Sequence, residues 1–206
     1  MDNGKRYVVT IQRQFGSLGR PIAKKMAEML DIEFYDRDIV EQTAAKLALP
    51  VSDIEKAEET DSPVEYNQFW RMMFPLGRGE NETQEKIFEA QSNIIKFLAE
   101  KENCIIVGRC ADFVLNDMDE ILNIFIYAPY KERVKNCIEE LNLTEEQAKK
   151  MCVEVDAARE AYQIKHAGFK AGDRYTEHIM IDSSVLGVDG TAEYLVEAVK
   201  RRFKLD

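Results

Sequence analysis

The chain has 206 residues, an apolar fraction of 45% and a formal net charge of −10. This composition suits a single domain spanning 1–206 with its own core, and the negative charge argues against a general affinity for nucleic acid, which requires Lys and Arg. No stretch approaches the roughly 18 uninterrupted apolar residues of a membrane span, and the N-terminal segment lacks the apolar run of a signal peptide. We therefore expect a cytoplasmic protein without a membrane partner.

Short β-rich runs alternate with longer segments of helical period, the pattern of an α/β fold with a mainly parallel sheet. Most of the runs are apolar on both faces, as strands covered on both sides should be. Five strands are predicted, at 7–11, 32–35, 104–107, 121–127 and 178–181. Apolar residues at helical spacing predict helices around 22–30, 87–98 and 192–203, and two capping boxes predict helices of about 83–102 and 144–167.

Two helix starts carry the capping-box spacing, in which a cap side chain and an amide three residues later satisfy each other's backbone N–H groups. The pairs are Asn81 with Gln84 and Thr144 with Gln147. The region 50–79 is less regular, with acidic residues followed by an aromatic and methionine cluster. It is interpreted as an insertion of short helices.

The cysteines and histidines show no metal-binding pattern. Four cysteines are scattered without a CxxC pair, so reduced thiols are expected. His166 and His178 stand far apart without ligand spacing and are interpreted as solvated or capping side chains.

A glycine-containing loop follows the first predicted strand and precedes a helix. Backbone N–H groups converge at such a junction and the helix dipole favours negative charge, so a phosphate is the expected guest. The candidate loop residues are Phe15, Gly16, Ser17, Leu18, Gly19 and Arg20.

This loop departs from the P-loop pattern GxxxxGK[ST]. Gly19 matches the second glycine, but Arg20 takes the lysine position, Pro21 the hydroxyl position and Gln14 the first glycine. A tight strand-to-helix turn with Pro21 at the first helical position explains the loop equally well.

Further segments in the same order resemble the cytidylate kinase-like family of P-loop nucleoside monophosphate kinases. They are IEFYDRD at 32–38, VGRCADFVL at 107–115, IFIYAPYKERV at 124–134, DAAREAY at 156–162 and HIMIDSS at 178–184. The resemblance covers nearly the whole chain. It implies a three-layer α/β P-loop kinase fold, with a parallel sheet of about five strands flanked by helices, a helical acceptor-side insertion at about 50–102 and a lid-like region at about 130–176.

The resemblance also implies ATP and Mg²⁺ as cofactors, a nucleotide or other small phosphorylated metabolite as partner, and roles for several arginines. Phosphoryl transfer depends on cations that hold the phosphates and absorb shifting charge. Arg20 is the candidate for the β- and γ-phosphates of the donor and Arg109 for the acceptor. Arg133 and Arg159 resemble lid arginines, although surface ion pairs on charged helices would explain both.

Two carboxylates complete the candidate site. Asp36 ends a strand of the predicted sheet, where open parallel sheets bind ligands, and it could hold a magnesium shell through water or contact the acceptor. Capping the following helix is an equally good explanation. Asp112 could replace a base-reading aspartate, because the family's GRD reads Gly108-Arg109-Cys110 here. That departure puts cytosine recognition in question, and the metal ligands and oligomeric state stay unassigned.

The predicted activity is ATP-dependent phosphorylation of a nucleoside monophosphate, with CMP or dCMP as the first acceptor. A catalytically weak nucleotide-binding or regulatory protein is the main alternative, favoured by the missing lysine and hydroxyl. A kinase of another small metabolite is a second alternative, since a fold does not determine its substrate.

Overall fold

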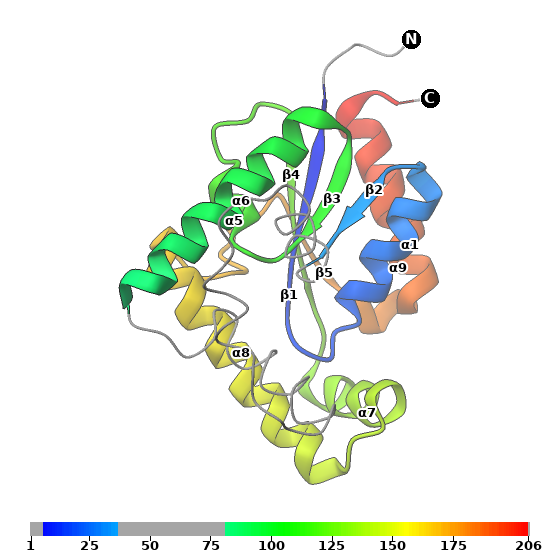
Figure 1. Cartoon of the computed structure of the whole chain (residues 1–206). Coiled ribbons are helices and arrows are strands. Elements are labelled where there is room, and N and C mark those ends of the chain that lie inside the picture. Colours follow the sequence, from blue (N-terminus) through cyan, green and yellow to red (C-terminus); the bar gives the residue numbers. More distant parts are fainter. Residues whose placement is uncertain (1–5, 37–80, 206) are drawn as a thin grey trace.

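The computed structural model describes residues 6–36 and 81–205. Its centre is a five-stranded parallel sheet with the strand order β2-β3-β1-β4-β5 (Figure 1). The strands are β1 Val8–Arg13, β2 Glu33–Tyr35, β3 Cys104–Val107, β4 Ile121–Tyr127 and β5 Ile179–Asp182. All five predicted strands are therefore confirmed, within two residues at each end.

The first strand runs further than its apolar pattern indicated. It continues through Gln12 and Arg13, which pair in parallel register with Phe125 and Ile126 of β4. The backbone hydrogen bonds of the ladder carry these two polar residues to the carboxyl edge of the sheet. The end of β1 therefore presents Arg13 at the edge where ligands bind in parallel sheets.

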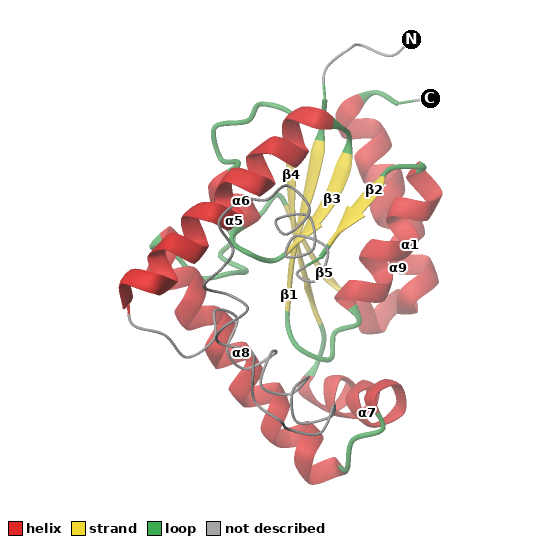
Figure 2. Cartoon of the chain, in the orientation of Figure 1, coloured by secondary structure: helices red, strands yellow, loops and turns green. Residues whose placement is uncertain are grey.

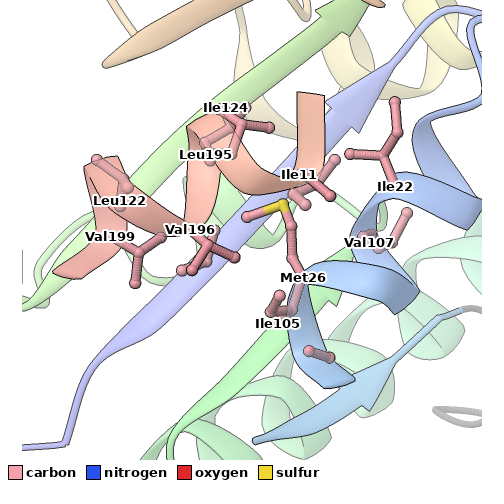
Figure 3. Close-up of a cluster of buried hydrophobic side chains, with 14 of the residues drawn as sticks. Ile11, Ile22, Met26, Ile105, Val107, Leu122, Ile124, Leu195, Val196 and Val199 are labelled. Atoms are coloured by element: carbon pink, nitrogen blue, oxygen red, sulfur yellow. The ribbon is translucent and has the colours of Figure 1, made fainter. Parts of the chain in front are cut away.

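Helices cover both faces of the sheet, which gives three layers (Figure 2). The helices α1 Gly19–Leu30 and α9 Ser183–Phe203 lie on one face, and α5 Asn81–Lys101 and the short α6 Ala111–Val114 on the other. On the first face, Met26 and Leu195 point towards Ile11 and Ile124 of the central strands (Figure 3). A second cluster packs α5 against β3 through Ile95, Leu98 and Ile106 and their neighbours.

Two further helices extend beyond the carboxyl edge of the strands, at the end of the molecule away from both termini (Figure 1). They are α7 Tyr130–Leu141 and α8 Glu145–Ala167. The predicted capping box at Thr144 is confirmed, because its hydroxyl accepts from the Gln147 backbone N–H and the Gln147 amide oxygen accepts from the Thr144 backbone N–H. The buried residues between the two helices pack around Phe15 of the loop after β1.

Some predictions lie outside the described residues, namely the insertion at 50–79 and the side chains of the capping box at Asn81. The four cysteines are buried free thiols, as expected. Within 6–36 and 81–205, no helix is long and apolar enough to cross a membrane.

Candidate functional site

The loop after β1 turns into α1 through left-handed backbone at two positions. Gly16 has φ +77° and Leu18, the residue before the helix, has φ +58°. The helix begins at Gly19, so Pro21 is its third residue and not its first, where the alternative interpretation as a tight turn placed it. A proline there fits the turn but lacks one of the N–H groups that a helix N-terminus offers to an anion.

Hydrogen bonds attach this loop to the neighbouring strand and helix. The Ser17 hydroxyl lies 2.9 Å from the Gln14 carbonyl and 3.1 Å from the Ile126 carbonyl. The Ser183 hydroxyl, at the start of α9, donates to the Ser17 carbonyl at 2.7 Å. The hydroxyl of Ser17 is therefore used to hold the loop against β4.

The helix α8 contacts the same loop with an acidic and a basic side chain. The Asp156 carboxylate accepts from the Phe15 backbone N–H at 2.7 Å and from the Arg133 guanidinium. Arg159 donates to the Arg13 carbonyl at 3.2 Å, and its guanidinium lies 5.8 Å from the centroid of the Phe15 ring. The Asp156 carboxylate of α8 therefore already accepts from one backbone N–H of the predicted phosphate loop.

The helix α7 holds the loop from a second side. Arg133 donates to the Phe15 carbonyl at 3.2 Å, and the Asn136 amide donates to the Gly16 carbonyl at 2.8 Å. Only 8% of Arg133 is exposed. Its pairing with Asp156 is therefore a partly buried contact at the loop, unlike the surface ion pair that charged helices alone suggested.

The segment after β3 has an unusual backbone. Gly108, Arg109 and Cys110 have φ values of +78°, +59° and +52°. Left-handed backbone costs a non-glycine residue about 1–2 kcal/mol, and such outliers concentrate at functional sites. This turn brings the buried Arg109 side chain to the same edge of the sheet as the loop after β1.

The strand end at β2 contributes the buried carboxylate of Asp36, which forms an ion pair with Arg20 of α1. The side chain of Arg20 is 63% exposed, whereas that of Asp36 is 6% exposed. The ion pair joins two of the predicted site residues across the edge of the sheet. The residues after 36, where Asp36 was expected to cap a helix as the alternative, lie outside the described range.

Arg13 lies at the centre of this group, although the sequence interpretation did not select it. Burial, followed by the charges of Arg159 and Arg109, lowers the pKa of Arg13 well below its ordinary value, while Asp36 opposes this and Arg20 adds to it. Burial also lowers the pKa of Arg159 to about 10. The sequence signal available was a basic residue at the end of a strand that leads into a glycine-containing loop.

Asp112 occupies a separate buried network beneath this edge. One of its carboxylate oxygens accepts from the Gln12 amide at 2.9 Å and the other from the Gln163 amide at 2.8 Å. Only 2% of Asp112 is exposed, and burial raises its pKa. The nearby Glu177 is also buried, which is the main cause that raises its pKa to about 7, and Asp112 raises it further.

In a comparison with known protein families, the model of the cytidylate kinase-like family matches residues 8–185. The chain belongs to the cytidylate kinase-like family. In a comparison with curated proteins, none matches the chain.

Solved structures share the fold of this chain. An uncharacterized protein from Eubacterium ventriosum ATCC 27560 is 25% identical, with a TM-score of 0.72 over 95% of this chain and 99% of the other. Protein TT1252 from Thermus thermophilus is 12% identical, with a TM-score of 0.59 over 96% and 97%. A shikimate kinase from Bacteroides thetaiotaomicron is 12% identical, with a TM-score of 0.54 over 97% and 99%. The three-layer fold of P-loop kinases is thereby confirmed for this cytidylate kinase-like chain.

The predicted site residues converge at the carboxyl edge, except for one. The phosphate-loop candidates, Arg20, Asp36, Arg109, Arg133 and Arg159 all belong to this edge or to the helices that contact its loop. Asp112 is bound within the network below, and its part in acceptor binding stays a prediction. The sequence interpretation assigned no role to Arg13, Asn136 or Asp156.

Proposed function

We propose that this cytidylate kinase-like protein transfers the terminal phosphoryl group of ATP to a nucleoside monophosphate, with CMP or dCMP as the first acceptor to test. An oxygen of the acceptor phosphate would form a bond to the γ-phosphorus as its bond to the bridging oxygen breaks, which gives ADP and a nucleoside diphosphate. The observation that supports this best is the meeting of Arg13, Arg20, Arg109 and Arg159 around the loop that precedes α1. Such positioned cations supply most of the catalysis in phosphoryl transfer.

In this proposal different arginines bind the phosphates of the donor and of the acceptor. Arg20 follows the loop and would contact the donor, whereas Arg109, on the strained turn after β3, would hold the acceptor phosphate. Arg133 and Arg159 contact the loop backbone from α7 and α8, and would close over the phosphates and exclude water. Asp112 would act on the acceptor through the amides of the buried network that it shares with Gln12.

The fit to magnesium is partial. Pro21 stands where a P-loop offers a metal-binding hydroxyl, and the Ser17 hydroxyl is committed to two carbonyls. Asp36 lies at the end of β2 on this edge, and its carboxylate is paired with Arg20. Magnesium would therefore rest mainly on the phosphates of ATP, with Asp36 contacting its water shell, and would neutralise the charge that develops on them.

One observation favours a second candidate function, that of a nucleotide-binding or regulatory protein with weak activity. The Phe15 N–H, one of the donors that a phosphate loop presents, is occupied by the Asp156 carboxylate. A phosphate must displace that carboxylate or bind to the remaining donors. This contact, together with Pro21, supports a protein that holds phosphate better than it transfers it.

A coupled assay with ATP, magnesium and a panel of nucleoside monophosphates separates the two candidates. Turnover with any member of the panel supports the kinase, and binding of ATP without turnover supports the regulatory alternative. A parent protein that binds no nucleotide in calorimetry would refute both.

Substitutions at Arg20 test the donor side. Arg20→Ala should weaken ATP binding by roughly 1.5–3 kcal/mol, the range for hydrogen bonds to charged groups. The double substitution Arg20→Lys with Pro21→Ser restores the usual lysine and hydroxyl and should raise turnover. Arg201→Ala is the matched control, because Arg201 lies exposed on α9 and pairs with Glu197. ATP binding by Arg20→Ala equal to that of the parent would reduce this loop to a turn.

A further inference from the structure

We propose that Arg13 is a further phosphate-binding residue, whose guanidinium contacts the terminal phosphates of the donor nucleotide. The inference rests on the proposed function and deepens it. It assigns to Arg13 the contact that the P-loop lysine makes in other proteins of this fold. Three features of the structure support it: the space that the side chain fills, the charges around it, and the commitment of Arg20 to another partner.

The side chain of Arg13 fills space that two glycines leave open. A Cβ atom on Gly19 would lie 2.8 Å from the Cβ of Arg13 and 3.0 Å from its Cγ. A Cβ atom on Gly108 would lie 2.5 Å from Nη1 of Arg13. Arg13 therefore runs from the phosphate loop to the turn that carries Arg109. This is the path between the donor side and the acceptor side of the proposed site.

The charges around Arg13 favour the binding of an anion. Among the described charges that act on Arg13, those of Arg159, Arg109 and Arg20 are positive and that of Asp36 is negative. Positive charge therefore prevails around the Arg13 guanidinium. Burial makes such an excess unfavourable unless an anion compensates it, and the terminal phosphates of a nucleotide carry the negative charge to do so.

Arg20 is less suited than Arg13 to enclose a phosphate. The side chain of Arg20 is 63% exposed and its guanidinium is paired with Asp36. Arg13 instead lies between two loops, and the Arg159 guanidinium donates to its backbone carbonyl. A planar guanidinium held in one orientation can donate to two oxygens of a phosphate at once. Arg13 is therefore the arginine that this fold presents already oriented for binding.

The test compares Arg13→Gln with the parent and with Arg201→Gln, which removes an exposed arginine of α9 far from the site. Calorimetry with ATP and with inorganic pyrophosphate, in magnesium, measures binding to the terminal phosphates directly. Both affinities should fall about 10- to 100-fold in Arg13→Gln and stay unchanged in Arg201→Gln. Arg13→Lys keeps the charge but not the two-pronged donor, and its affinities should fall between those of the parent and Arg13→Gln.

The melting temperature of Arg13→Gln without ligand distinguishes a binding role of Arg13 from a structural role. Removing a cation that three neighbouring arginines repel should leave the melting temperature unchanged or raise it, whereas loss of a structural arginine would lower it. Gly108→Ala, which displaces the guanidinium without removing its charge, should also weaken pyrophosphate binding.

The outcomes separate this inference from the proposed function. Parent-like affinity for ATP and pyrophosphate in Arg13→Gln would overturn the role of Arg13 and leave the kinase proposal standing. A lowered melting temperature with parent-like affinity would overturn it as well, in favour of a structural role. A parent that binds neither ligand would refute the proposed function and the inference together.

Discussion

The contact between Gly16 and α7 allows a sharp test of how this helix holds the loop. A Cβ atom on Gly16 would lie 2.6 Å from the Arg133 carbonyl oxygen and 2.9 Å from the Cys137 sulfur. Real Cβ atoms do not approach heavy atoms so closely, so Gly16→Ala must push α7 away from the loop. The hydrogen bond from Asn136 to the Gly16 carbonyl would then lengthen or break.

The expected cost combines two contributions that a control can separate. An alanine at φ +77° costs about 1–2 kcal/mol for its left-handed backbone, and the overpacked contact adds about 1–3 kcal/mol. Gly168 has φ +79° but nothing within 4 Å of the added Cβ. The substitution Gly168→Ala therefore carries the backbone cost alone.

Urea unfolding of both variants and the parent measures the difference. Gly16→Ala should lower the free energy of unfolding by about 1–3 kcal/mol more than Gly168→Ala, and it should weaken ATP binding, which Gly168→Ala should not. Adding Cys137→Ala to Gly16→Ala should recover part of the loss, because it removes the sulfur from the contact. Equal destabilisation by the two glycine variants would show that the loop and α7 are not packed as described.

Two titratable groups, the buried Glu177 and the half-buried His166, predict opposite pH effects on stability, each measured by urea unfolding between pH 5 and 8. Burial raises the folded pKa of Glu177 to about 7, so its contribution is fully present below the unfolded value near 4.5 and is lost as the pH rises through 7. The Glu177→Gln variant can still accept from the Gly172 N–H, and its free energy of unfolding should exceed that of the parent by up to about 3 kcal/mol at pH 8. This difference should shrink towards pH 5. A difference that is the same at every pH would refute the raised pKa of Glu177. Burial lowers the pKa of His166, which stacks on Phe88 and lies against Tyr162, so its contribution is lost as the pH falls below about 6.5. His166→Phe should remove this loss of stability at low pH. A variant whose free energy of unfolding falls with decreasing pH as steeply as that of the parent would contradict the prediction.

The sequence alone predicted the order and type of the elements, because hydrophobic period and capping are local properties. The strands at 104–107 and 121–127 are apolar on both faces, as strands between two helical layers must be, and their bounds are confirmed. The capping box at Thr144 is written in two residues three apart and is also confirmed. The interpretation of His166 as solvated or capping was wrong, because its stacking partner Phe88 comes from a helix distant in sequence.

For the candidate site too, some features were predictable from the sequence and others depend on the tertiary structure. The sequence identified the loop at 15–20 and the arginines, since phosphate chemistry calls for glycine, a helix start and cations in a recognisable order. Only the tertiary structure brought Arg13 between two glycines, paired Arg20 with Asp36, and set the Asp156 carboxylate on the Phe15 N–H. These contacts join residues up to 141 positions apart, as the one between Phe15 and Asp156 does. No local pattern encodes such contacts, because they depend on how the parallel strands align their carboxyl ends and on where α8 crosses that edge.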